Sequence, residues 1–271
     1  MKFMKRAVLW SVVMALAVPV PAITAEWKPK KAIHMVIPTG PGGTYDSIGR
    51  VLASEMAKIV GQPVVVENVP GAGQALSAVQ VYNAKPDGYT ILYNNTMSMI
   101  INQYVYGAKY DFRKFDYLGQ VYDTTKSPTT TVASGTKSGL NSWNDVLKLG
   151  RPVRFGTVGK GSIPHITGVA LAYAFGLKNP TYILGYTGGA DAFGGVARGE
   201  ADLVCFPWNL VDPYIKSGDL QFLMVFSKKE RLANYPNIPT AGELGHPELV
   251  DQTGTQHILM TPPGTPKEHR R

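Results

Sequence analysis

The sequence predicts an α/β protein that folds into two lobes with a cleft between them. Three observations support this prediction: strand and helix patterns alternate along the chain, they do so in two separate series, and glycine-rich loops follow several predicted strands. With 271 residues, the chain is long enough for one large domain or two smaller ones. We therefore expect two α/β units joined by extended segments.

The first series of strands and helices follows the N-terminal segment. Short apolar runs predict its strands, and apolar residues at helical spacing predict the helices between them. The predicted strands are 32–37, 64–66 and 89–93, and the predicted helices are 47–59 and 74–82. Because short loops connect these elements in alternation, a parallel sheet with helical crossovers is expected.

A second series follows two extended segments at 117–121 and 129–133, and it begins near Trp143. The same patterns predict strands at 153–158, 182–186, 203–206 and 220–226, and helices at 164–175, 189–198 and 210–216. The two series are separate along the chain, so each is expected to build its own lobe.

The first 25 residues have the order of segments found in a secretory signal peptide. Three positive charges between Met1 and Arg6 precede an apolar run at 7–18, and small residues follow up to Ala25. The apolar run is too short for a resting transmembrane helix, although an uncleaved anchor is the alternative. We expect cleavage after Ala25, or after Ala22, and secretion of the mature chain.

The charges, histidines and single cysteine argue against several classes of function. The net charge is +8, but no run of five or more basic residues interleaved with aromatics suggests a nucleic-acid partner. Cys205 lies among apolar residues and is expected to be a buried, inert thiol. The histidines lack metal-ligand spacing, and no nucleophile and base can be assembled. We expect no metal, no cofactor and no enzymatic activity.

The loop from Thr39 to Thr44 joins the first predicted strand to the first predicted helix. Its glycines, Gly40, Gly42 and Gly43, allow close approach of a ligand, and the helix N-terminus favours an anion such as a carboxylate or phosphate. The glycine spacing does not match the dinucleotide-binding motif, and a tight turn without a ligand is the other alternative. Asp46 either pairs with Arg50, recognises a ligand cation or holds this loop.

Glycine-rich loops occupy corresponding positions in the second series, at 159–165, 185–189 and 207–209. Ser162 either caps the following helix or offers its hydroxyl to the cleft, and His165 is either packed there or functional. Ligands collect at the carboxyl ends of parallel strands, so these loops are expected to converge on one cleft.

Several motifs, in order along nearly the whole mature chain, resemble those of one protein family. They include residues 37–46, 61–68, 70–73, 86–90, 161–165, 186–189, 199–202, 236–245 and 262–266. This series resembles the Bug family of periplasmic solute receptors, the TctC-type binding components of tripartite tricarboxylate transporters.

The resemblance implies a two-lobe, Venus-flytrap fold of periplasmic-binding-protein type II. Residues 26–122 and 252–271 would form the first lobe, and residues 123–251 the second. Family members continue past the Pro-Gly-Thr-Pro motif into a helical segment that packs on the first lobe, whereas this sequence stops at Arg271. We therefore expect a truncated C-terminus and reduced stability.

The resemblance also implies a periplasmic, monomeric receptor that binds a small carboxylate and delivers it to the membrane subunits of a transporter. The residues implied in ligand binding are Thr39, Gly42, Gly43, Thr44, Asp46, Asn95, Thr96, Ser162, His165, Tyr186 and Gly188. Tyr45, Tyr186 and Trp208 either offer flat walls to an aromatic acid or pack in the core. A sensory receptor of the same fold, and less so a secreted hydrolase, are the alternative functions.

Overall fold

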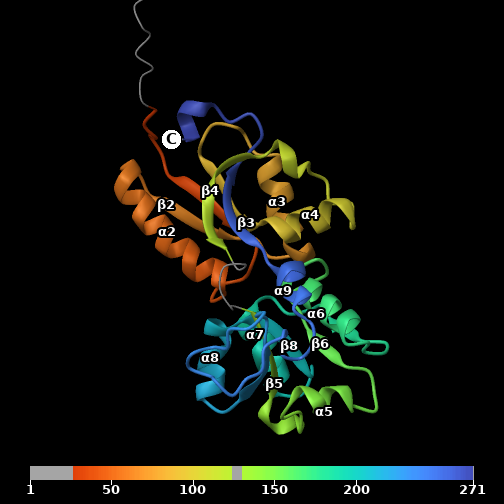
Figure 1. The fold of residues 1–271 in the computed structure, drawn as a ribbon. Helices are drawn as coiled ribbons and strands as arrows, with labels where there is room; N and C mark the ends of the chain where they lie inside the picture. The colour runs from red at the N-terminus through yellow and green to blue at the C-terminus, as the bar shows by residue number, and fades with distance from the viewer. Residues whose placement is uncertain (1–26, 124–129, 271) are drawn as a thin grey trace, which may run out of the picture.

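The computed structural model of the chain describes residues 27–123 and 130–270, so the predicted signal peptide lies outside the described residues. Within these residues the chain forms two five-stranded sheets with helices packed around them (Figure 1). The predicted α/β fold class is therefore confirmed. None of the described helices is both long enough and apolar enough to cross a membrane.

The first sheet has the strand order β2-β1-β3-β10-β4. Its strands are β1 (Ile33–Ile37), β2 (Val64–Asn68), β3 (Thr90–Asn95), β4 (Asp116–Asp123) and β10 (Gln256–Thr261). The predicted parallel pairing holds for β1 with β2 and β3, but β10 runs antiparallel to both β3 and β4. β10 was not predicted from the sequence, and it enters this sheet after the whole second series has been completed.

The second sheet has the order β7-β6-β8-β5-β9. Its strands are β5 (Thr130–Gly135), β6 (Arg154–Gly156), β7 (Thr181–Ile183), β8 (Leu203–Pro207) and β9 (Leu220–Val225). Again β6 is parallel to β7 and β8, whereas β5 is antiparallel to β8 and β9. The chain thus moves from the first sheet to the second between β4 and β5, and returns between β9 and β10.

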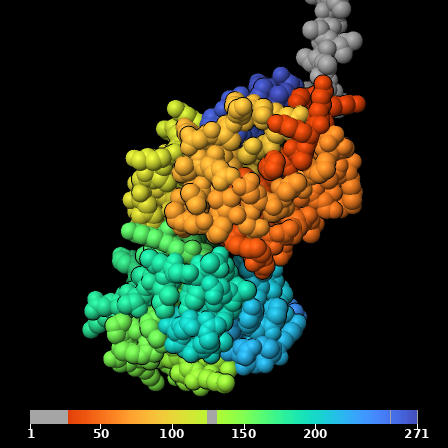
Figure 2. Space-filling view, turned by 180° about the vertical axis from the view of Figure 1, so that it is seen from behind, coloured from red at the N-terminus to blue at the C-terminus, as the bar shows by residue number. Residues whose placement is uncertain are grey.

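The α-helices of the described residues flank these sheets. They are α2 (Thr44–Val60), α3 (Ala75–Tyr82), α4 (Thr96–Tyr104), α5 (Trp143–Leu147), α6 (Ile163–Ala174), α7 (Gly189–Ala197), α8 (Trp208–Lys216) and α9 (Glu248–Thr253). Short 3₁₀ turns lie at Ala72–Gln74, Phe112–Lys114, Thr136–Ser138 and Lys267–Arg270. Figure 2 shows from behind how the half built around the first sheet rests on the half built around the second.

Alternation of side chains along the strands gives the first sheet two apolar faces. Met35 and Ile37 pack against α2 on one face, and Val36 and Leu92 pack against α3 and α4 on the other. The second sheet has its own core, in which Cys205 is 1% exposed. Burial raises the pKa of the Cys205 thiol to about 12, so the expectation of a buried thiol is confirmed.

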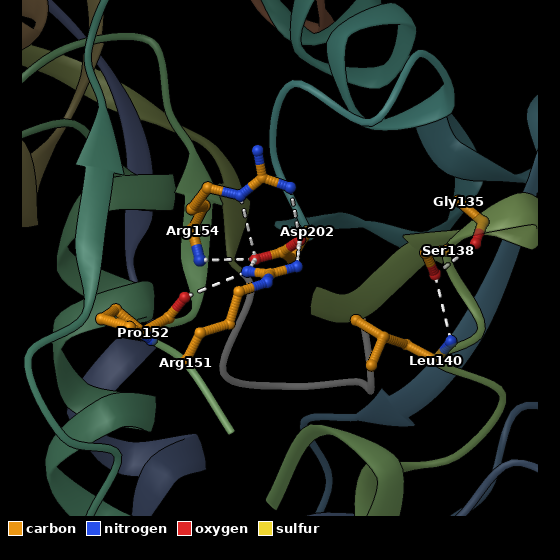
Figure 3. Close-up of polar contacts among 7 residues, drawn as sticks. All are labelled: Gly135, Ser138, Leu140, Arg151, Pro152, Arg154 and Asp202. Atoms are coloured by element: carbon orange, nitrogen blue, oxygen red, sulfur yellow. Dashed lines mark hydrogen bonds and ion pairs between the residues drawn. The ribbon is translucent and has the colours of Figure 1, made fainter. Parts of the chain in front are cut away.

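One buried carboxylate joins two strands of the second sheet (Figure 3). The Asp202 side chain is 3% exposed and accepts hydrogen bonds of 2.7–3.2 Å from the guanidinium groups of Arg151 and Arg154. The Arg154 backbone N–H also donates to it. Burial opposes ionisation of Asp202, but these hydrogen bonds outweigh it and hold its pKa well below the usual value. Asp202 thereby fixes the start of β8 against β6.

Candidate functional site

A cavity of about 60 Å³ lies where the two halves of the molecule meet. Its walls come from the ends of strands in both sheets and from the first turns of the helices that follow them. The residues that line it are Thr39, Gly43, Thr44, Tyr45, Gln74, Val158, Ile163, Pro164, Gly189, Cys205, Phe206, Pro207, Leu210, Thr253, Thr255 and His257. None of these described lining residues is Asp, Glu, Lys or Arg.

Helix N-termini converge on this cavity from both halves. Gly43 precedes α2, Ile163 and Gly189 begin α6 and α7, and Pro207 precedes α8. In none of these four described helices does the N-cap side chain accept a hydrogen bond from the first turn. By contrast, Asn95 caps α4, which begins outside the cavity. The first-turn N–H groups and positive dipole ends at the cavity are therefore disposed toward an anion.

Thr39 lies at the end of β1, beside the start of α2. Its Oγ1 is buried and has no hydrogen-bond partner among the described residues, although Thr39 lines the cavity. A methyl group added to Gly43, the N-cap residue of α2, would lie 3.5 Å from this Oγ1, so the hydroxyl is close to the start of that helix. A buried hydroxyl without a partner costs free energy, so this group is disposed to meet a ligand atom.

Asp46 holds the glycine loop from behind. Its carboxylate accepts hydrogen bonds from the Gly42 N–H at 3.0 Å, from Arg50 Nε at 3.1 Å and from Asn68 Nδ2 at 3.1 Å. Asn68 also donates to the Thr39 carbonyl oxygen at 2.9 Å. Hydrogen bonding to Arg50, above all, lowers the pKa of Asp46 to about 2, so it is ionised at neutral pH. Asp46 does not line the cavity, and its contacts support the loop-holding interpretation.

A layer of neutral polar side chains lies on the first-sheet side of the cavity. Asn95 Nδ2 donates to Tyr45 Oη at 2.7 Å and to Gln74 Oε1 at 2.6 Å. The His257 ring stacks on Tyr45 with ring centroids 4.6 Å apart, and its Nδ1 lies 3.2 Å from Tyr93 Oη. Burial lowers the pKa of His257 to about 4, so its imidazole is neutral at pH 7. We call Tyr45, Gln74, Asn95 and His257 the polar floor.

The second-sheet side of the cavity is apolar. Val158, Ile163, Phe206 and Leu210 contribute hydrocarbon surface, and Cys205 of β8 also lines this wall. Phe206 is 7% exposed and belongs to the core around α7. We call this surface the apolar wall.

The structure divides the predicted ligand-binding residues into groups. Thr39, Gly43 and Thr44 line the cavity. Gly42 lines a neighbouring groove beside α7 and α8, and Tyr186 lines a separate space that it shares with Thr39. The others do not line the cavity: Asp46, Asn95, Thr96, Ser162, His165 and Gly188.

Among these other residues, Thr96 and Gly188 belong to helix starts. Thr96 begins α4, with its Oγ1 3.4 Å from Thr255 Oγ1. Gly188 precedes α7 in an extended conformation. Asn95 lies one step behind the cavity, where it orients Tyr45 and Gln74.

Ser162 and His165 stabilise the loop before α6. The Ser162 hydroxyl donates to the Gly159 carbonyl oxygen at 2.7 Å and makes no side-chain cap, so the predicted capping hydrogen bond is absent. His165 Nδ1 accepts from the Gly161 N–H at 3.3 Å. Burial, together with the nearby Lys160 charge, lowers the pKa of His165. Both side chains thus stabilise the conformation of the loop that precedes α6.

Close contacts to backbone carbonyl groups join the two halves beside the cavity. The Gly40 N–H donates to the Thr187 carbonyl oxygen at 3.3 Å, and Asn102 Nδ2 donates to the Gly161 carbonyl oxygen at 3.4 Å. A methyl group on Gly73 would lie only 1.7 Å from the Lys160 carbonyl oxygen. The glycines at these points allow the halves to approach more closely than any side chain would permit.

Sequence reasoning missed two of the four residues of the polar floor, Gln74 and His257. Gln74 was read only as the start of a helix, and His257 lies on the strand that was not predicted. The glycine motif before Gln74 is a signal for close backbone approach, and it could have drawn attention to the residue that follows it. The described residues contain no group of three or more His, Cys, Asp or Glu side chains that could hold a metal ion.

Comparison with known proteins matches this chain to a family. A model described as "Tripartite tricarboxylate transporter family receptor" (TctC) matches residues 48–270. Protein BugT of Bordetella pertussis is 30% identical over 253 residues, which cover 90% of this chain and 74% of BugT.

Solved structures show the same fold. The periplasmic binding protein BugD has a TM-score of 0.79 at 28% identity, covering 89% of this chain and 80% of BugD. MatC from Rhodopseudomonas palustris, solved with bound malate, also has a TM-score of 0.79, at 24% identity, over 89% of this chain and 81% of MatC. These likenesses confirm the predicted periplasmic-binding-protein fold. Together with the family match, they show that the chain belongs to the family of tripartite tricarboxylate transporter receptors.

Proposed function

We propose that this receptor works in the periplasm, captures a small carboxylate in the cavity and delivers it to the membrane subunits of a tripartite tricarboxylate transporter. One observation carries the proposal: uncapped N-termini of four helices converge on a cavity whose lining has no charged side chain. Each helix end has a partial positive charge, so together they offset the charge of a buried anion without a cationic side chain.

The ligand carboxylate would contact Thr39, Gly43 and Thr44, which lie at the start of α2. Thr39 Oγ1 would then gain the partner that it lacks. The remaining predicted residues would act indirectly, as Asp46 does by holding the loop. No catalytic step is required of these groups, and a monomer supplies all of them.

The two sheets would act as lobes that close on the ligand, with boundaries near residues 122 and 252 and the signal peptide removed. The contact between Gly73 and Lys160 indicates a closed arrangement, in which ligand binding favours closure. Of the three aromatic residues considered as walls for an aromatic acid, Tyr45 lines the cavity, whereas Tyr186 and Trp208 do not. The malate-bound relative favours an aliphatic acid as the ligand.

Thermal unfolding in the presence of candidate ligands tests this function. We expect malate or succinate to stabilise the purified chain by about 2.7 kcal/mol at a hundred times the dissociation constant. Benzoate tests the aromatic alternative, and glucose serves as a neutral control that should produce no shift. Stabilisation by glucose, with none by any carboxylate, would refute the proposal.

A further inference from the structure

A short loop of the second half, Gly159-Lys160-Gly161, fits against the first half beside the cavity. Both of its glycines have positive φ angles, 127° and 84°. A methyl group on Gly161 would lie 2.6 Å from Asn102 Oδ1, and one on Gly159 would lie 3.0 Å from the Gly73 nitrogen. Side chains at these two positions would therefore push the halves apart. Lys160, between them, supplies the only side chain of the loop.

Hydrogen bonds within the second half hold this loop in shape. The Gly159 carbonyl oxygen accepts from the Ser162 N–H at 3.2 Å and from the Ser162 hydroxyl at 2.7 Å. The Gly161 N–H donates to His165 Nδ1 at 3.3 Å. Because none of these partners belongs to the first half, the loop can present the Lys160 side chain whether or not the halves are in contact.

The Lys160 side chain reaches across to the first half. Its Nζ lies over the Tyr106 ring, 4.6 Å from the ring centroid, which is within the range of a cation–π contact. Tyr106 follows α4, and its N–H donates to the Ile101 carbonyl oxygen at 3.3 Å, so its backbone is tied to that helix. The loop precedes α6, and α4 and α6 lie on the same side of the molecule, one in each half (Figure 1).

This contact lies at a groove that adjoins the cavity. Lys160 lines a groove of about 360 Å³, which shares Thr39 and Val158 with the cavity. Residues 70–73 form its wall in the first half, and residues 158–160 and 184–187 form its wall in the second. A contact that holds these walls together therefore restricts one route by which a ligand can leave the cavity.

We propose that Lys160 and Tyr106 form a clasp that holds the two halves closed and lengthens the time for which a ligand stays bound. Neither residue lines the cavity, so both are positioning residues that act through the closed arrangement. The inference rests on the proposed function, in which the halves close on a carboxylate. The clasp contact belongs to the closed state, so its loss should speed dissociation more than it slows association.

Stopped-flow kinetics with malate, or with succinate if it binds more tightly, test the clasp. Tyr106→Leu and Lys160→Met should each raise the dissociation rate roughly three- to fivefold, as expected for an exposed cation–π contact, and leave the association rate within twofold. Tyr106→Phe and Lys160→Arg keep the ring face and the cation, so dissociation should stay slow. The double variant should dissociate no faster than the faster single variant, because the two side chains act as one contact.

Matched controls separate the clasp from charge and from general damage. Lys160→Met also removes a positive charge near a bound anion, so rates are measured in about 0.3 M salt, where distant charges are screened. Tyr106→Leu leaves that charge in place. Tyr104→Leu, at the end of α4, and Lys178→Met, after α6, change exposed residues that line neither the cavity nor the groove. Both control variants should keep both rates within twofold.

Small-angle X-ray scattering of the ligand-free protein gives a second readout, in which Tyr106→Leu and Lys160→Met should increase the radius of gyration. If no carboxylate binds, the proposed function fails and scattering alone decides, with an unchanged radius in both variants overturning the clasp. If a carboxylate binds but dissociation is unchanged in both variants, or Tyr106→Phe speeds it as much as Tyr106→Leu, the clasp is overturned and the carboxylate receptor stands.

Discussion

The two sides of the cavity differ in chemistry although they are built in the same way. Each side has parallel strands whose carboxyl ends lead into helices, and each contributes helix N-termini. The first-sheet side adds the polar floor, in which hydrogen bonds orient the amides of Asn95 and Gln74. The second-sheet side adds the apolar wall and no comparable polar network. The helix N-termini of both sides would therefore attract an anion, whereas only the first-sheet side would form side-chain hydrogen bonds with the polar groups of the ligand.

Because the two sides differ in this way, low pH should lower the stability of the first-sheet side more than that of the second-sheet side. His257 has its pKa lowered to about 4 by burial, so the folded protein binds its proton only below the pH at which the unfolded chain does. The stability that this neutral histidine contributes is complete above pH 6.5 and falls as the pH drops toward 4, by on the order of 3 kcal/mol.

Urea unfolding at pH 7, 5.5 and 4.5 measures this effect. His257→Gln should flatten the loss between pH 6.5 and 4, even if it lowers stability at pH 7. His165→Gln is the control from the second side, where partial burial lowers the histidine pKa, and it should flatten the curve less. Equal flattening by the two variants would contradict the contrast between the sides.

Closure of the two sides depends on Gly73. The variant Gly73→Ala would place a methyl group 1.7 Å from the Lys160 carbonyl oxygen, so the halves should no longer meet. We expect carboxylate affinity to fall by about a hundredfold, which corresponds to about 2.7 kcal/mol. Gly61→Ala is the matched control, because Gly61 has a φ of 70° but no atom within 4 Å of an added methyl group. Calorimetry should show unchanged affinity for this control, and an equal loss in both variants would assign the effect to backbone strain.

The smallest expected effect concerns Thr39, whose buried hydroxyl has no partner among the described residues. Thr39→Val should stabilise the ligand-free protein by up to about 1 kcal/mol, because an unsatisfied hydroxyl is replaced by a methyl group. The same change should weaken carboxylate binding roughly tenfold. Thermal unfolding and titration measure the two effects, and a loss of stability without ligand would show that the hydroxyl has a structural role.

The alternating elements could be predicted from the sequence because local patterns determine them. The strand at 32–37 and the helix that ends before Gly61 match β1 and α2, since a buried apolar run and a glycine terminator are local signals. The strand β10 was missed because its pairing partners, β3 and β4, lie more than 130 residues earlier in the chain. Its residues acquire their role only when the chain returns to the first sheet.

The candidate site shows the same limit. Thr39, Gly43 and Thr44 were predicted because a glycine loop before a helix has a recognisable composition. His257 carries no such signal, and the glycines before Gln74 indicate only close backbone approach. The place of both side chains at the cavity depends on Asn95 and Tyr45, which approach them only in the folded protein. Asn95 was predicted to touch the ligand; it does not line the cavity, and its amide donates to Tyr45 and Gln74, which do.

The apolar wall contains the chain's only cysteine, and this gives the protein an internal probe of its own motion. Alkylating reagents attack the thiolate, and Cys205 is 1% exposed with a pKa raised by burial to about 12. Modification therefore requires a motion that exposes the thiol, which lies at the wall of the cavity. The rate at which a thiol reagent labels Cys205 would report the frequency of opening, without any added label, and a bound ligand would slow that rate in proportion to its occupancy.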